Sequence, residues 1–158
     1  MKTKILIGIT SILFFLIGFN NYQSFLNFFL GLIPELEIQY RTLYAQLSQT
    51  FFFGLVLSVI PILSLILWIK FKIQHNGLKI FIILLFLVSS IIASISRTLF
   101  LKWIYQGAYN AMSHPKPLLY EGEDLNYNLY IFVSEIIIFI LLYFILKKPK
   151  IREQKIND

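Results

Sequence analysis

Four long runs of apolar residues dominate the sequence, and short polar segments separate them. The runs cover residues 5–22, 48–69, 80–101 and 126–146. Each approaches the roughly 20 residues that an α-helix needs to cross a hydrocarbon layer about 30 Å thick. The runs lack the alternation of barrel strands, and a helix satisfies its own backbone in lipid. The pattern predicts an all-α integral membrane protein, a four-transmembrane-helix bundle that forms one domain over residues 1–158.

The composition favours the same class of protein. Of the 158 residues, 58% are hydrophobic and 14% are charged, and the charges gather at the ends of the apolar runs. A net charge of +6 could indicate a nucleic-acid-binding protein, but the basic residues flank apolar runs and form no basic domain of their own. We therefore expect membrane lipid and no nucleic acid as a partner. The absence of cysteine excludes disulfides, thiolate metal sites and thiol catalysis.

The distribution of basic residues predicts the orientation, because Lys and Arg are retained on the cytoplasmic side of short loops. Four of the fourteen lie in or beside the two long loops, residues 23–47 and 102–125. The other ten lie at the N-terminus, in the turn of residues 70–79 and in the tail of residues 147–158: Lys2, Lys4, Lys70, Lys72, Lys79, Lys147, Lys148, Lys150, Arg152 and Lys155. We predict that both termini are cytoplasmic and both long loops are outside, in a bacterial cytoplasmic (inner) membrane.

The first apolar run has a second interpretation. Lys2 and Lys4 followed by an apolar stretch are also typical of a secretory signal peptide. After Phe19, however, the residues 20–23 are Asn, Asn, Tyr and Gln, and no pair of small residues marks a cleavage site. We favour an uncleaved membrane anchor, and either outcome leaves the orientation of the later spans unchanged.

The first long loop contains two patterned stretches. Residues 25–33 are largely apolar and are expected to lie in the membrane interface. After Pro34, apolar residues recur at helical spacing, which predicts an amphipathic helix that leads into the second span: Leu36, Tyr40, Leu43, Tyr44 and Leu47. This helix would serve as a lid or docking surface, or would rest on the lipid headgroups.

The second long loop begins with three aromatic residues, Trp103, Tyr105 and Tyr109, whose apolar rings and polar tips suit the headgroup layer. We predict that they are interfacial anchors. Residues 114–117, His-Pro-Lys-Pro, end any helix, and residues 121–124 form an acidic turn. The spacing of this turn matches no calcium or zinc pattern, so we expect a solvated turn.

Glu135 is the one ionisable residue well inside a predicted span. A charge at that depth costs roughly 2.5 kcal/mol or more unless it is paired or hydrated. The third span offers a partner surface of small and polar residues on one broad helical face, which includes Ser89, Ser90, Ser94 and Arg97. These residues with Glu135 form the candidate polar site. Arg97 lies roughly 9 Å shallower than Glu135 by helical rise, so a direct pair requires tilt or a side chain that reaches down.

Two classes of function fit these features. We found no phosphate-binding loop, paired metal-binding histidines or nucleophile elbow, and expect no cofactor, bound metal or catalysis. The leading hypothesis is a non-enzymatic accessory, assembly or immunity-type protein that acts through contacts with another membrane protein. The alternative is a small homo-oligomeric transporter or channel that uses Glu135 and the serine face. For Glu135 itself, the competing interpretation is a structural contact that fixes helix register.

Overall fold

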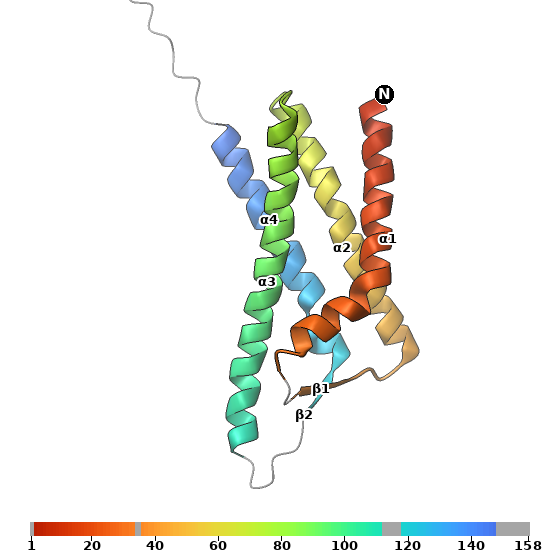
Figure 1. Cartoon of the computed structure of the whole chain (residues 1–158), viewed down its shortest axis with the longest axis vertical. Helices are drawn as coiled ribbons and strands as arrows, with labels where there is room; N and C mark the ends of the chain where they lie inside the picture. The colour runs from red at the N-terminus through yellow and green to blue at the C-terminus, as the bar shows by residue number, and fades with distance from the viewer. Residues whose placement is uncertain (1, 34–35, 112–117, 148–158) are drawn as a thin grey trace, which may run out of the picture.

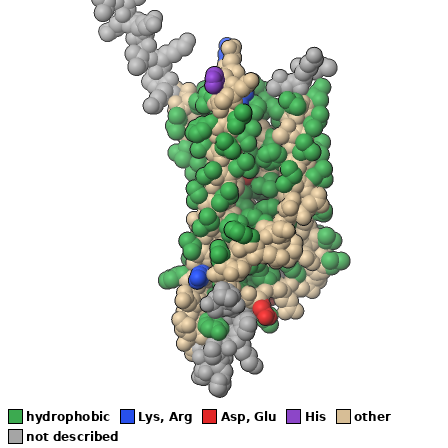
Figure 2. All heavy atoms as spheres, viewed as in Figure 1, with side chains coloured by type: hydrophobic (Ala, Val, Ile, Leu, Met, Phe, Trp, Pro, Cys, Tyr) green, Lys and Arg blue, Asp and Glu red, His purple; other side chains and the backbone are tan. Residues whose placement is uncertain are grey.

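A computed structural model describes residues 2–33, 36–111 and 118–147. Its elements are four long helices, two short strands and one 3-10 helix (Figure 1): α1 Lys2–Leu30, β1 Leu36–Gln39, α2 Leu43–Lys70, α3 Asn76–Asn110, β2 Leu118–Glu121, η1 Gly122–Leu125 and α4 Tyr127–Leu146. The four α-helices are long and apolar enough to cross a membrane, and hydrophobic side chains cover much of the visible face of the bundle (Figure 2), which indicates an integral membrane helical bundle. The predicted helix-ending residues 114–117 and the tail after residue 147 lie outside the described residues.

The helices pass up and down, with one short connection, between α2 and α3, at one end and the two longer connections at the other. α1 packs mainly on α2, and α3 packs mainly on α4. The start of α1, the turn between α2 and α3 and the end of α4 lie at the same end of the bundle, which we call the turn end (Figure 1). The opposite end carries β1, β2 and η1, and we call it the sheet end.

Three helices, α1, α2 and α3, are longer than the apolar runs that predict them, and α1 and α3 exceed their runs by the most. α3 has 35 residues, roughly 50 Å at the standard rise, so it extends well past a 30 Å hydrocarbon layer. α1 continues to Leu30, and its C-terminal part turns across the sheet end of the bundle (Figure 1). In this part Leu26 and Phe29 are buried while Phe28 remains exposed, so the apolar stretch after the first span packs one side against the core.

The amphipathic helix predicted after Pro34 forms only from Leu43 onward, as the first turns of α2. Residues Leu36–Gln39 are strand β1, which pairs in parallel with β2, with Leu36 opposite Leu118 and Gln39 opposite Glu121. Residues 36–40 also alternate between buried or half-buried and exposed positions, which is the period of a strand. α2 begins only at Leu43, where the Thr42 hydroxyl caps the helix by accepting a hydrogen bond from the Ala45 amide at 3.1 Å.

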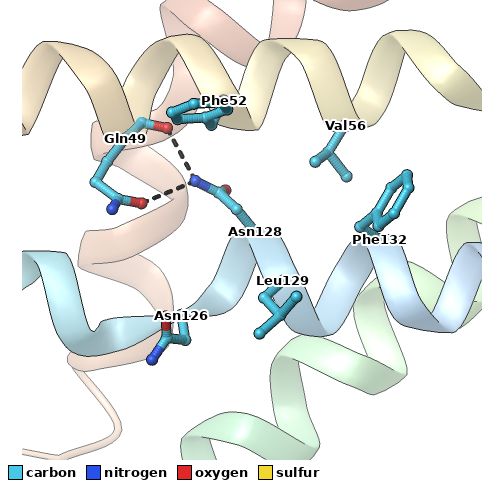
Figure 3. Close-up of a pocket in the computed structure, with 7 residues that line it drawn as sticks. All are labelled: Gln49, Phe52, Val56, Asn126, Asn128, Leu129 and Phe132. Carbon is cyan, nitrogen blue, oxygen red and sulfur yellow. Dashed lines mark hydrogen bonds between the residues drawn. The ribbon is translucent and has the colours of Figure 1, made fainter.

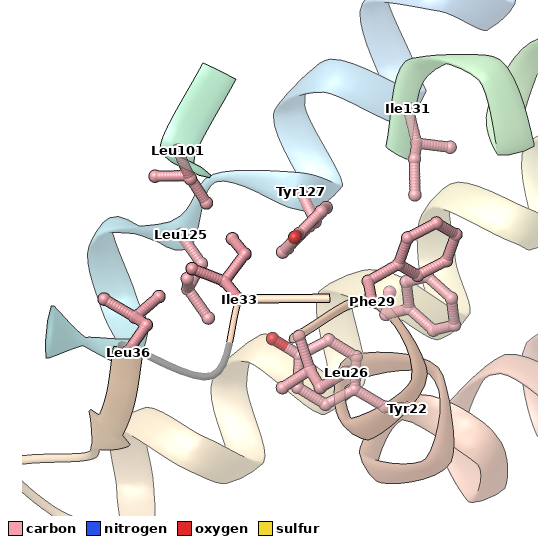
Figure 4. Close-up of a cluster of buried hydrophobic side chains, with 10 residues drawn as sticks. Tyr22, Leu26, Phe29, Ile33, Leu36, Leu101, Leu125, Tyr127 and Ile131 are labelled. Atoms are coloured by element: carbon pink, nitrogen blue, oxygen red, sulfur yellow. The ribbon is translucent and has the colours of Figure 1, made fainter. Parts of the chain in front are cut away.

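The buried apolar residues form two clusters, one toward each end of the bundle. The sheet-end cluster combines side chains from all four helices and both loops (Figure 4): Tyr22, Leu26, Phe29, Ile33, Leu36, Phe53, Leu101, Leu125, Tyr127 and Ile131. The turn-end cluster lies among α2, α3 and α4: Ile60, Leu63, Leu67, Ile82, Phe86 and Leu142. Along α3 and α4, the candidate polar residues fall between these two clusters.

Candidate functional site

The polar residues of α3 and α4 form a layer between the two apolar clusters. We define the polar layer as Ser90, Ser94 and Glu135, which are all buried. On α4, Glu135 follows Ile131 of the sheet-end cluster by one helical turn and precedes Leu142 of the turn-end cluster. The helical periods of α3 and α4 therefore bring these three side chains to the helix interface.

Glu135 is incompletely satisfied within this layer. Its side chain is fully buried, and the Ser90 hydroxyl lies 3.4 Å from Glu135 Oε1, at the long limit of a hydrogen bond. The same hydroxyl donates to the backbone oxygen of Phe86 at 2.9 Å. A hydroxyl carries a single hydrogen, so Ser90 cannot donate fully to both oxygens. Glu135 Oε2 has no hydrogen-bond partner among the described residues.

The other hydroxyl groups of the α3 face bind the backbone of their own helix. Ser89 donates to Phe86 O and Ser94 donates to Ser90 O, each at 2.8 Å. These bonds satisfy the hydroxyl groups without a partner from another helix. The small side chains thus allow close approach of α4, and only Ser90 of this set contacts the carboxyl group.

Arg97 does not form the predicted pair with Glu135. Its guanidinium donates from Nε to Leu125 O at 2.9 Å and from Nη2 to Asp124 O at 3.1 Å. The group also lies over the Tyr130 ring, 5.0 Å from its centre. Ser90 marks the level of Glu135 on α3, and Arg97 is seven residues further along, roughly 10 Å. At this level along α3, the guanidinium group meets the backbone carbonyl groups of η1. Arg97 therefore fastens η1 to α3.

A second polar contact also joins α3 to α4 near the sheet end. The hydroxyl groups of Thr98 and Tyr127 lie 2.7 Å apart, and the Thr98 hydroxyl also contacts Ser94 O at 2.8 Å. Sequence reasoning missed this pair, although Thr98 lies four residues from Ser94 and so on the same helical face.

The three predicted anchors lie on the last turns of α3 and have different surroundings. Trp103 is 74% exposed, whereas Tyr105 and Tyr109 are half-buried. The Tyr105 ring packs edge-on against Tyr120 of β2, with 5.2 Å between ring centres. Tyr105 therefore supports the short sheet in addition to any contact with the headgroup layer.

Loops from the two halves of the chain are fastened together at the sheet end. β1 pairs with β2, and Arg41 forms an ion pair with Glu121. The Tyr40 and Tyr22 hydroxyl groups lie 3.4 Å apart. Gly122 leaves room for the Tyr40 ring, because a Cβ at this position would overlap the ring.

Comparison of the chain with models of known protein families, with curated proteins and with solved structures finds no match.

Proposed function

We propose that the chain is a bacterial cytoplasmic-membrane protein with both termini inside and the sheet end outside. The support is the charge distribution, since ten of the fourteen basic residues belong to the N-terminus, the turn of residues 70–79 and the tail. The start of α1, the turn between α2 and α3 and the end of α4, from which these segments extend, all lie at the turn end. An even number of spans requires both termini to lie on the same side, and the charge distribution independently favours the cytoplasmic side for both.

Within that membrane, the proposed role is that of a non-enzymatic accessory, assembly or immunity-type protein that acts through contacts with another membrane protein. The observation that carries this proposal is the construction of the sheet end. Strand pairing, the Arg41–Glu121 ion pair and the contact of Tyr40 with Gly122 join the two long loops into one surface of defined shape. Arg97 fastens the second of these loops to α3. Loops that serve only to connect spans need no such cross-connection, whereas a binding surface gains from being preorganised.

The exposed side chains of this surface suit a protein partner. Leu119 of β2 is 68% exposed, and Tyr44 in the first turn of α2 is 81% exposed. Polar and charged groups surround Leu119, since Gln39, Arg41 and Glu121 line the same pocket of about 260 Å³. An apolar side chain within a polar rim is the usual arrangement of a protein contact.

A photoreactive amino acid at Leu119, with Gln74 as the matched position at the exposed turn end, tests this proposal. We expect crosslinking in cells to one membrane protein from position 119 and none to that protein from position 74. The same partner should copurify in a fixed ratio after gentle detergent extraction, and Leu119→Asp should abolish copurification while the bundle stays folded. Equal crosslinking from both positions, or copurification that Leu119→Asp leaves intact, would contradict the proposal.

The second candidate function is a small homo-oligomeric transporter or channel, and the unpartnered oxygen of Glu135 favours it. A buried carboxyl group between two apolar clusters is a typical proton or cation site. The polar path would run along Glu135, Ser94 and Arg97 on the α3–α4 side of the bundle. A homo-oligomer that conducts pH-dependent flux in liposomes, with loss of flux in Glu135→Gln, would establish this function. A monomer with the flux of empty liposomes would eliminate it.

A further inference from the structure

A groove between α2 and α4 near the sheet end has a polar end and an apolar end (Figure 3). Its volume is about 320 Å³. Gln49, Asn126 and Asn128 line it at the ends of the two helices. Four apolar side chains line it deeper in the bundle: Phe52, Val56, Leu129 and Phe132. No charged residue is among these lining residues.

An amide pair fixes the chemistry of the polar end. Asn128 Nδ2 donates to Gln49 O at 3.0 Å and to Gln49 Oε1 at 2.9 Å (Figure 3). Because its Oε1 accepts from Asn128, the Gln49 amide has a fixed orientation and its Nε2 remains as a donor. No hydrogen bond from Gln49 Nε2 is formed within the described residues. Asn128 Oδ1 is buried and accepts no hydrogen bond from them.

The length of the groove along α2 is about two thirds of the hydrocarbon thickness of one leaflet. From Gln49 to Val56, seven residues along α2, the distance is roughly 10 Å. One leaflet contributes roughly 15 Å of hydrocarbon. Phe52 and Leu129 are 52% and 56% exposed, so the deep part of the groove opens on the lipid side of the bundle.

We propose that this groove binds one glycerophospholipid of the leaflet at the sheet end. One acyl chain lies between Phe52 and Phe132, and its ester carbonyl accepts a hydrogen bond from Gln49 Nε2. An uncharged polar end above an apolar slot matches the ester region above an acyl chain, so the site recognises the part that all glycerophospholipids share. A helix from a second copy would present continuous side chains and no carbonyl group to Gln49, since helical carbonyl groups are used within the helix.

Photolabelling of the wild-type protein locates the lipid without any substitution. The probe is a phosphatidylcholine with a diazirine in one acyl chain, incorporated into phosphatidylethanolamine and phosphatidylglycerol vesicles that contain the protein. We expect labels on Val56 and Phe132 to exceed those on Ile62 and Ile137 at least fivefold, although Ile62 and Ile137 are 45% and 52% exposed. Uniform labelling of all four positions would show ordinary annular lipid and overturn the proposal.

Native mass spectrometry then measures binding. The probe is palmitoyl-oleoyl phosphatidylethanolamine added to the detergent-purified protein. Val56→Trp fills the apolar slot and should weaken retention of one lipid at least fivefold, whereas Ile62→Trp on the same helix should retain it like the wild type. Gln49→Leu should weaken it to a smaller extent, because only the ester contact is lost. Equal retention by Val56→Trp and wild type, or a dimer that Val56→Trp separates, would refute a lipid site here.

Discussion

Gly54→Ala should weaken the packing of α1 on α2, because the two helices touch there through their backbones. A Cβ at Gly54 would lie 2.8 Å from Phe15 O and 3.0 Å from the Phe15 ring, and a Cβ at Gly18 would lie 2.9 Å from Gly54 Cα. Carbon atoms in contact lie about 3.5–4.0 Å apart, so α1 must retreat by roughly half an ångström or more, which forfeits about a quarter to a half of the local dispersion attraction.

Overpacking of this kind costs about 1–3 kcal/mol. The matched control is Gly8→Ala on α1, where a Cβ would meet nothing within 4 Å. That substitution should leave stability unchanged or raise it by about 0.5–1 kcal/mol, because alanine is the better helix former. Unfolding in mixed micelles with increasing dodecyl sulfate, followed by tryptophan fluorescence and circular dichroism, gives both values. If the two variants unfold at the same dodecyl sulfate fraction, the proposed close contact of α1 and α2 is wrong.

Three further substitutions test the polar contacts. Arg97→Met should lower the free energy of unfolding by about 2–4 kcal/mol, because a charged group loses two hydrogen bonds, and Arg97→Lys should restore only part of it; a stability change below about 0.5 kcal/mol would disprove the fastening of η1. Thr98→Val should cost about 1 kcal/mol through loss of the Tyr127 contact, and no cost in Thr98→Val would mean that the contact is dispensable. Glu135→Gln should keep the bundle folded while Glu135→Ala lowers the yield of folded protein; full tolerance of both would remove Glu135 from any structural role.

The positions of the spans could be predicted from the sequence because hydropathy is a local property. Each span could be located from its own apolar run without information about the other segments. The four runs correspond to the four long helices. The shared face of Ser90, Ser94 and Arg97 on α3 also followed from helical periodicity alone. The structure places Ser90 of this face against Glu135.

The sheet end could not be predicted in the same way, since its contacts join distant segments. β1 and β2 are separated by two complete helices, and residues 36–47 fit a helical period as well as a strand. The partners of Arg97 are backbone carbonyl groups, which every residue carries and no side-chain pattern reveals. From the sequence, Arg97 therefore stood out only as a candidate partner for Glu135.

Substituted-cysteine labelling tests the orientation on which the whole account depends, because the natural chain contains no cysteine. Leu119→Cys places a thiol at the sheet end, and Gln74→Cys places one at the turn end. In intact cells a membrane-impermeant maleimide should modify Leu119→Cys and leave Gln74→Cys unmodified until the membrane is opened. Modification of Gln74→Cys in intact cells with protection of Leu119→Cys would contradict the account.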